Sequence, residues 1–277
     1  MNYFADLTDT VAKALTEDVG DGDVSSFLVS EDKQARAGVI SRQTAIVCGR
    51  PWVDEVMRQV DPNIEINWLV DDGDLVQRDD ILYQLNGAAR SLLTAERTAL
   101  NFLQTLSGTA TRTRHYVDLI QDTNAVLLDT RKTIPGLRLA QKYAVKTGGA
   151  ENHRIGLFDA FLIKENHIRA AGSITAAVTQ AREIRPNIRL EVEVETGEEL
   201  KEAIATAPDW IMLDNFSHDD MVTAVARCQG TGIKLEASGG IEKADELRII
   251  ASTGVDFISL GTLTKNCEAI DLSMRFE

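Results

Sequence analysis

The stretch Ile188–Leu213, IRLEVEVETGEELKEAIATAPDWIML, decides the fold of this chain. The alternating run Ile188–Val194 predicts a strand, the helical pattern Gly197–Thr206 follows it, and the apolar run Trp210–Leu213 predicts a second strand. Two strands joined by one helix form the βαβ unit of a parallel sheet.

The same succession of strand and helix continues on both sides of this stretch. We predict further strands over Ala125–Asp129, Ala160–Lys164, Ile233–Ala237 and Phe257–Leu260, and helices over Ser173–Ile184, His218–Cys228 and Lys243–Ser252. No dinucleotide-binding glycine pattern follows the first of these strands. The pattern therefore favours a closed or nearly closed α/β barrel, and a doubly wound open sheet is the alternative.

The residues before position 115 follow a different pattern, typical of an antiparallel sheet with helices. Helical patterns cover Ala5–Val19 and Ser91–Gln121, the second with an interruption near Gly108. Between them lie alternating segments separated by turn signals such as Asn86-Gly87, namely Ala35–Ser41, Ala45–Cys48, Ile64–Val70 and Ile81–Leu85.

The net charge and the cysteine content argue against some classes of partner and indicate the cellular compartment. The chain has 29 Lys and Arg against 43 Asp and Glu, a net charge of −14, which argues against nucleic acid or an anionic membrane as the main partner. Cys48, Cys228 and Cys267 are an odd number without CxxC spacing, as expected for free thiols in a reducing compartment. With no signal-peptide pattern and only short apolar runs, we expect a soluble cytoplasmic protein.

Polar or glycine residues stand at the end of each predicted barrel strand. Because the carboxyl ends of barrel strands meet at one rim, these residues are the first candidates for an active site. They are Arg131 and Lys132, Lys164, Glu193, Asp214, the run Ser238-Gly239-Gly240, and Gly261.

The segment from Arg131 to Lys164 is basic within an acidic chain, with seven Lys or Arg and two acidic residues. Arg138, Lys142 and Lys146 are spaced four residues apart, so we interpret them as a solvated helix face.

Lys164 needs another explanation, because it ends the apolar run Phe161–Ile163 and a cation there is costly to desolvate. An internal salt bridge to Glu193 or Asp214 is one interpretation. We favour a bound anionic substrate, since further cations are expected on the same rim, namely Arg131, Lys132 and Arg154.

Among the histidines, His153 is the functional candidate, because it adjoins Arg154 and follows Gly148-Gly149, where a ligand can approach the backbone closely. The histidines show no zinc-ligand spacing.

The alternation of Leu190–Glu195 directs three carboxylates to one side of the strand. On an edge strand this side would be a solvated face, whereas in a barrel strand it faces the lumen, with Glu193 or Glu195 nearest the mouth. Glu193 together with Asp214 suits Mg²⁺ or sugar hydroxyls. Ser238-Gly239-Gly240 and Gly261-Thr262 have the composition of paired phosphate-binding loops, although a plain βα turn explains the first tripeptide equally well.

These motifs, in this order, resemble quinolinate phosphoribosyltransferase over essentially the whole chain. The resemblance is carried by Thr130–Arg138, Lys142–Val145, Gly148-Gly149, Asn152–Arg154, Leu162–His167, Glu191–Val194, Met212–Asn215, Glu236–Gly240, Gly254–Ser259, Thr94–Phe102 and Asp271–Phe276. The chief departure is Ala150-Glu151, where the family usually has a third glycine and a variable residue.

The resemblance implies an N-terminal α/β sandwich over residues 1–115 and a C-terminal incomplete α/β barrel over residues 116–277, with the C-terminal tail returning to the first domain. It also implies a homodimer in which Arg97 reaches the neighbouring subunit's site. The residue pattern alone instead suggests that Arg97 is a surface arginine.

The chemistry implied by the resemblance is a pentosyltransferase reaction of NAD biosynthesis, nicotinate-nucleotide diphosphorylase (carboxylating). Quinolinate and 5-phosphoribosyl-1-diphosphate would react with Mg²⁺ to give nicotinate mononucleotide, carbon dioxide and diphosphate. The carboxylates of quinolinate would be bound by Arg131, His153, Arg154 and Arg97, and further substrate charge by Lys132 and Lys164. Glu193 and Asp214 would hold ribose and Mg²⁺, and the 5-phosphate would lie against Ser238, Gly239, Gly240 and Gly261.

Three alternatives stay open at this point. They are a related phosphoribosyltransferase for another base such as nicotinate, a Schiff-base aldolase that uses Lys164, and an inactive metabolite-binding protein.

Overall fold

The computed structural model describes residues 1–241 and 243–277, which divide into two compact units. The first unit comprises Met1–Arg114, Thr133–Gly149 and Leu263–Glu277, and the second comprises His115–Lys132 and Ala150–Thr262. The segment 133–149 thus groups with the first unit, although the predicted boundary lies at residues 115 and 116. No helix in the described part of the chain has the length and apolar character needed to span a membrane.

The first unit contains a four-stranded antiparallel sheet in the order β12 (Leu272–Phe276), β1 (Gln34–Ser41), β5 (Ile81–Ala88) and β3 (Glu65–Trp68). A separate pair joins β2 (Ala45–Ile46) and β4 (Leu75–Val76). The four predicted strands are confirmed with shifted ends. The short β4 and the C-terminal β12 are additional.

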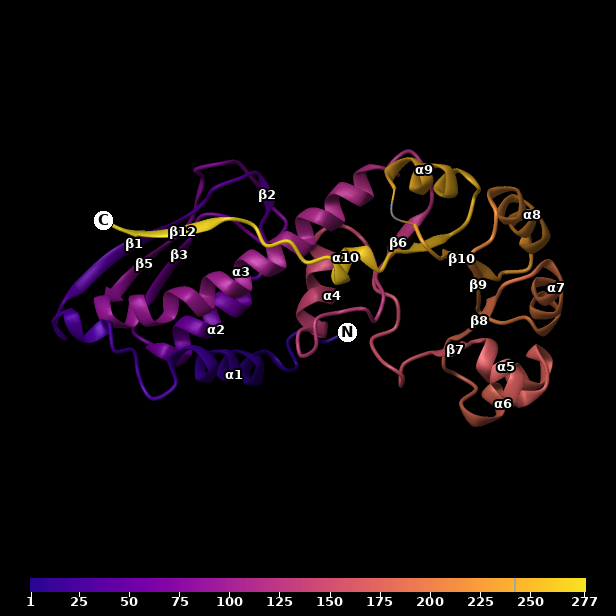
Figure 1. The fold of residues 1–277 in the computed structure, drawn as a ribbon, viewed down its shortest axis with the longest axis horizontal. Helices are drawn as coiled ribbons and strands as arrows, with labels where there is room; N and C mark the ends of the chain where they lie inside the picture. Colours follow the sequence, from indigo (N-terminus) through magenta and orange to yellow (C-terminus); the bar gives the residue numbers. More distant parts are fainter. Residues whose placement is uncertain (242) are drawn as a thin grey trace. The chain divides into compact units, whose positions relative to one another are not determined.

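Helices α1 (Leu7–Val19), α2 (Arg50–Val60) and α3 (Ala89–Asp118) lie on one side of this sheet, as Figure 1 shows. The unit also contains α4 (Arg138–Thr147) and a short 3₁₀ turn over Ser26–Leu28. The sequence pattern did not predict α2, although Pro51 lies in its first turn and its buried face carries the helical spacing Trp52, Val53, Val56 and Met57.

The predicted interruption of the long helix near Gly108 is wrong, because α3 continues through this residue. The glycine is explained by packing. A Cβ at position 108 would lie 2.0 Å from the carbonyl oxygen of Glu268, so the C-terminal segment passes directly over the helix backbone.

The predicted solvated face on α4 is also wrong at its centre. Lys146 is exposed, Arg138 is half-buried, and Lys142 is completely buried. Helical spacing shows which residues share a face, but only the packing partner decides whether that face meets solvent.

The second unit contains six parallel strands in the order β6 (Val126–Leu128), β11 (Phe257–Ser259), β10 (Lys234–Ser238), β9 (Trp210–Asp214), β8 (Leu190–Val194) and β7 (Phe161–Ile163). The edge strands β6 and β7 are not paired with each other, which makes the barrel incomplete, as expected. All six predicted strands are present.

Helices cover the outer side of this curved sheet (Figure 1). They are α5 (Glu165–Ala171), α6 (Ile174–Ile184), α7 (Gly197–Thr206), α8 (His218–Cys228) and α9 (Ala244–Ser252), and α10 (Thr262–Lys265) follows β11. The bounds of α7 and α8 are those predicted from the sequence. Capping side chains explain this agreement, because Thr196 and Ser217 accept N–H hydrogen bonds at the two helix N-termini.

Residues that precede β7 pack against the other edge strand. Glu151 forms a parallel bridge with Leu128, since its N–H donates to Leu127 and its carbonyl oxygen accepts from Asp129. This bridge places Glu151 beside the end of β6, and the predicted site residues His153 and Arg154 follow it closely in the chain.

Candidate active site

The parallel register brings the predicted strand-end residues to one edge of the six-stranded sheet. Asp214 at the end of β9 pairs with Ser238 at the end of β10, and Glu193 on β8 pairs with Met212 on β9. Because side chains alternate along a strand, Glu193 and Asp214 project to the same side of the sheet. Lys164 follows β7 and is the residue before α5.

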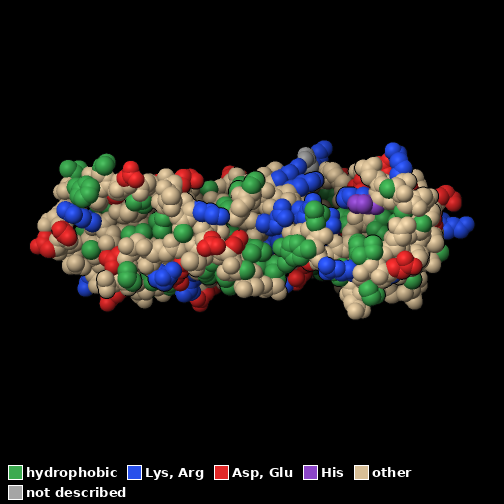
Figure 2. Space-filling view, turned by 90° about the horizontal axis from the view of Figure 1, so that it is seen from below, with side chains coloured by type: hydrophobic (Ala, Val, Ile, Leu, Met, Phe, Trp, Pro, Cys, Tyr) green, Lys and Arg blue, Asp and Glu red, His purple; other side chains and the backbone are tan. Residues whose placement is uncertain are grey.

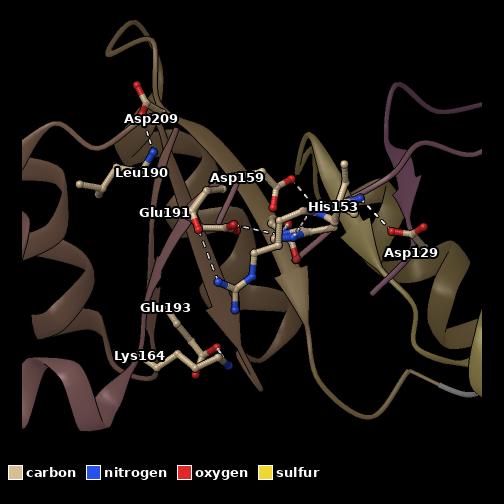
Figure 3. A network of polar contacts seen from close by, with 12 residues as sticks. Asp129, His153, Asp159, Lys164, Leu190, Glu191, Glu193 and Asp209 are labelled. Atoms are coloured by element: carbon tan, nitrogen blue, oxygen red, sulfur yellow. Dashed lines mark hydrogen bonds and ion pairs between the residues drawn. The ribbon is translucent and has the colours of Figure 1, made fainter. Parts of the chain in front are cut away.

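Lys164 and Glu193 form an ion pair between the Nζ and Oε2 atoms, which Figure 3 shows. The structure therefore contains the internal salt bridge that the sequence left as an alternative to an anionic substrate. The Glu193 side chain is 11% exposed, whereas that of Lys164 is 45% exposed. The cation thus keeps much of its surface open to a ligand, while the carboxylate is largely covered.

The loop after β10 packs closely against Asn215, the residue that follows β9. Asn215 has a positive φ of 56°, its N–H donates to the carbonyl oxygen of Ser238, and its side-chain amide donates to Asp214. A Cβ at Gly239 would lie 2.3 Å from Oδ1 of Asn215, and Gly239 itself has a φ of 108°. Only glycine meets both conditions without strain.

The loop after β11 lies against the basic segment that follows β6. A Cβ at Gly261 would lie 3.0 Å from Cδ of Lys132 and 3.7 Å from both its Nζ and Oγ1 of Thr130. The Lys132 side chain therefore lies beside the Gly261 backbone, which places its ammonium group next to the second predicted phosphate loop.

The guanidinium groups of Arg131 and Arg154 are close enough for their positive charges to interact. Burial, and next the positive charge of Arg131, lower the pKa of Arg154 from its usual value. Like charges are costly at close range unless an anion is bound between them. This arrangement suits a ligand with more than one negative charge.

His153 lies in a buried polar cluster below this rim (Figure 3). Its Nε2 is 2.8 Å from Oε2 of Glu191 on β8 and 3.2 Å from Oε2 of Glu236 on β10, and both carboxylates are fully buried. The N–H of Arg154 donates to Nδ1 at 2.7 Å. Because Nδ1 is an acceptor, the ring proton lies on Nε2, facing the two carboxylates.

Titration in this cluster reflects its burial. Burial lowers the pKa of the His153 imidazole, but the hydrogen bonds and charges of Glu191 and Glu236 raise it above its ordinary value. The Arg154 N–H, 2.7 Å from Nδ1, leaves no room for a second ring proton, so the proton that these carboxylates stabilise is the one on Nε2. Burial, and then the charge of Glu236, raise the pKa of the Glu191 carboxyl to about 7. The cluster therefore favours retaining protons that exposed groups of these types would lose.

Asp129, at the end of β6, fixes the backbone before Arg154. Its Oδ1 accepts from the His153 N–H at 2.9 Å, and its Oδ2 accepts from the Asn152 side-chain amide at 2.8 Å. Asp129 is completely buried.

The sequence-based site did not include Asp129, Glu191 or Glu236. Two signals were present. Glu236 is the single carboxylate inside the otherwise apolar core of its strand, and Glu191 belongs to the alternating acids expected inside the barrel. Of those three acids, Glu191 is buried and Glu193 lies near the rim, whereas Glu195 follows the strand and is exposed.

Arg97 is exposed on α3 of the first unit, as the residue pattern suggested. Its role in a neighbouring subunit stays a prediction. In the space-filling view, Lys and Arg side chains are visible at many places on the face shown, although the chain as a whole is acidic (Figure 2).

Metal ligation can be compared for two sets of residues. The predicted pair, Glu193 and Asp214, offers the carboxylate oxygens that Mg²⁺ prefers. Among the described residues, the one group of three His, Cys, Asp or Glu side chains with ligand atoms within 4.8 Å of one another is different, namely His153, Glu191 and Glu236.

Comparisons with known proteins agree across both halves of the chain. The model of the quinolinate phosphoribosyl transferase N-terminal domain matches residues 23–107, and that of its C-terminal domain matches residues 109–275. The chain is similar to the probable nicotinate-nucleotide pyrophosphorylase [carboxylating] of Bacillus subtilis, at 41% identity over 93% of this chain and 89% of the relative. The relative of the same description from Synechocystis is 43% identical over 94% and 89% of the two chains.

A solved structure gives the same result for the fold. The structure of the nicotinate-nucleotide pyrophosphorylase from Francisella tularensis is 50% identical and superposes with a TM-score of 0.95, covering 98% of this chain and 96% of that one. With both domain models matched in order and relatives similar over nearly their full length, this chain belongs to the quinolinate phosphoribosyltransferase family.

Proposed function

We propose that this chain transfers the phosphoribosyl group of 5-phosphoribosyl-1-diphosphate to quinolinate, with decarboxylation, in the de novo biosynthesis of NAD. The products are nicotinate mononucleotide, carbon dioxide and diphosphate. The observation that carries the proposal is the gathering of cations at the strand ends of an acidic member of this family. Both substrates carry several negative charges, so the reaction needs such a site.

The two carboxylates of quinolinate bind to Arg131 and Arg154. Planar guanidinium groups suit this task, because each can donate two parallel hydrogen bonds to one carboxylate. The mutual repulsion of Arg131 and Arg154 supports the assignment, since a bound dianion relieves it. His153 was predicted to join them, but both of its ring nitrogens have protein partners.

The phosphoribosyl substrate binds along the loops after β10 and β11. Ser238, Gly239, Gly240 and Gly261 offer backbone N–H groups to the 5-phosphate, and Lys132 lies beside Gly261. Lys164 meets carboxylate or diphosphate charge with the exposed part of its side chain.

Glu193 and Asp214 hold the ribose hydroxyls and would hold Mg²⁺, which, when bound, neutralises charge on the departing diphosphate. Their negative charge stabilises the oxocarbenium-like C1 as its bond to diphosphate breaks. The Lys164–Glu193 ion pair holds one of these carboxylates in place before substrate binds.

Electrons balance without an external acceptor. The lone pair of the ring nitrogen forms the bond to C1 while the C1–O bond electrons leave with diphosphate. The resulting pyridinium is cationic, so when the C2 carboxylate departs as carbon dioxide, the electron pair left on C2 is stabilised by the adjacent positive nitrogen. A proton from solvent then completes C2. The protein contributes positioning and electrostatic stabilisation.

The direct test is formation of nicotinate mononucleotide from quinolinate, with and without Mg²⁺, and with nicotinate as the competing base. A site built for two carboxylates leaves a cation without its partner when nicotinate binds, so quinolinate should be strongly preferred. Equal turnover of nicotinate, or none of either base, contradicts the proposal.

Arg131→Ala tests the assignment of the carboxylate site. Loss of a buried charged contact costs on the order of 2–5 kcal/mol of transition-state stabilisation, so kcat/KM for quinolinate should fall by at least about 25-fold. Wild-type turnover at saturating quinolinate would show that Arg131 has another role.

We further propose that the active form is a cytoplasmic homodimer in which Arg97 of each subunit completes the neighbouring site. If so, Arg97→Ala and Lys164→Ala homodimers are each inactive, but mixing them restores about a quarter of wild-type activity, because half of the dimers are hybrids with one intact site. Activity that is not regained after subunit exchange, verified by mass spectrometry of the mixed dimers, rules this arrangement out.

A further inference from the structure

The buried cluster of His153, Glu191 and Glu236 is not explained by the reaction as proposed above. Two fully buried carboxylates face a single imidazole nitrogen. Burial of this kind is costly. Within the described residues, Oε1 of Glu191 and Oε1 of Glu236 accept no hydrogen bond, and the two Oε2 atoms both face Nε2 of His153, at 2.8 and 3.2 Å.

We propose that Glu191 and Glu236 are positioning residues, which fix the ring of His153 through Nε2 and thereby orient Arg154 toward a carboxylate of the base. This inference rests on the proposed function, because it assigns Arg154 to the carboxylate site.

His153 is held at every polar atom of its ring. Nε2 lies between Glu191 and Glu236, and Nδ1 accepts from the N–H of Arg154. The ring also lies against Trp210 in a T-shaped arrangement, with centroids 6.1 Å apart and the planes at 86°. The ring is thus held by β8, β9 and β10 together, and it has one available orientation.

This orientation is transmitted to Arg154 through one peptide. The backbone on the N-terminal side is fixed by Asp129, which accepts from the His153 N–H at 2.9 Å. On the C-terminal side, the hydrogen bond from the Arg154 N–H to Nδ1 is available only while the ring proton lies on Nε2. Acceptors at Nε2 therefore preserve the bond that aligns Arg154.

Charge also connects this cluster with Arg154. The Glu191 carboxylate favours the charged form of Arg154, whereas burial and the neighbouring Arg131 oppose it. Glu191 thus offsets part of the repulsion between the two guanidinium groups before substrate arrives. This explains why acidic side chains, which repel an anionic substrate, lie inside a barrel whose rim binds anions.

The geometry also separates this cluster from the Lys164–Glu193 pair. Glu191 and Glu193 both belong to β8, but Figure 3 shows Glu191 directed toward His153 and Glu193 directed toward Lys164. Disturbing the His153 cluster should therefore affect the base more than the phosphoribosyl substrate.

The test compares Glu191→Gln and Glu191→Leu, with the same pair at Glu236. The Gln oxygen still accepts from Nε2–H, so Glu191→Gln should keep KM for quinolinate within threefold of wild type. Glu191→Leu removes the acceptor and should raise that KM at least tenfold, with KM for 5-phosphoribosyl-1-diphosphate changed by less than twofold. The exposed Glu198→Gln, in the helix that follows the same strand, serves as the control and should match wild type.

A spectroscopic measurement keeps the inference testable if the Leu variants do not fold. The chain has 4 histidines, so ¹⁵N spectra of the imidazoles can be assigned with His153→Asn. We expect a protonated Nε2 and an unprotonated Nδ1 for His153 in the wild type, and the same tautomer in Glu191→Gln, whose amide oxygen still accepts from Nε2–H.

Four results would overturn the inference. They are a wild-type His153 that carries a proton on Nδ1, equal rises of both KM values in Glu191→Leu, a Gln variant as impaired as the Leu variant, and one equivalent of tightly held divalent metal that is lost from Glu236→Gln. The last would identify the three side chains as a metal site. An inactive wild-type enzyme would instead refute the proposed function, while the ¹⁵N measurement would still decide the tautomer.

Discussion

Replacing Gly239 with alanine tests whether the loop after β10 binds the phosphoribosyl substrate. The new Cβ would lie 2.3 Å from Oδ1 of Asn215, and the backbone φ of 108° is one that alanine rarely adopts. Asn215 cannot simply turn away, because its amide donates to Asp214 and its N–H is hydrogen-bonded to Ser238. The loop itself must therefore shift.

The expected size of the effect follows from backbone strain and steric overlap. A residue forced into a sparsely populated backbone region costs about 1–3 kcal/mol, and relief of this strain moves the loop away from the position that binds phosphate. At about 1.4 kcal/mol for each factor of ten, kcat/KM for 5-phosphoribosyl-1-diphosphate should fall by roughly 5- to 150-fold. KM for quinolinate should change little.

Gly240→Ala is the matched control in the same loop. Its φ of 49° lies in the left-handed region, but a Cβ there meets no atom within 4 Å. It should therefore cost less than Gly239→Ala. Steady-state kinetics with the phosphoribosyl substrate varied at saturating quinolinate, together with thermal unfolding of each variant, separate binding from stability. If Gly239→Ala kept the wild-type KM, or if Gly240→Ala were the more impaired, the assignment of this loop would be wrong.

Two further predictions concern stability. Gly108→Ala should destabilise the protein in urea unfolding, because overpacking against the Glu268 carbonyl costs about 1–3 kcal/mol, more than the roughly 1 kcal/mol gained in helix propensity. The control is Gly197→Ala at the start of α7, where a Cβ meets no atom within 4 Å, and it should be neutral or stabilising. The opposite order of stabilities would refute the packing argument. The hydrogen bond from Arg58 lowers the pKa of Glu55 to about 2, so this carboxylate stabilises the fold above its ordinary pKa of 4.5 and the contribution is lost as the pH falls from 4.5 toward 2. Glu55→Gln should therefore be less stable than wild type at pH 7 and lose less stability on acidification, and parallel unfolding curves from pH 7 to 3 would contradict this.

Much of the fold followed from local patterns. Periodicity predicted the six parallel strands, and the capping residues Thr196 and Ser217 marked the starts of α7 and α8. These signals are local, because hydrogen bonding and side-chain direction repeat within a few residues. The missed helix α2 carried such a signal as well, with Pro51 in its first turn.

Local sequence patterns could not predict which charged side chains pair with one another or are buried. The sequence left Lys164 with two interpretations, and the structure contains its ion pair with Glu193, 29 residues away. Lys142 was expected on a solvated face and is buried, and Gly108 was expected to interrupt a helix that runs through it. In each case the outcome depends on a partner distant in the chain.

The sequence by itself determined the strand–helix order, the family and the residues that stand at the strand ends. Only the tertiary structure decided which of those residues share partners, and it alone brought His153 between Glu191 and Glu236, the first of which is 38 residues away. The physical reason is that strand and helix preferences are set by neighbours along the chain, whereas burial, charge pairing and proton location depend on groups that only the folded chain brings within a few ångströms.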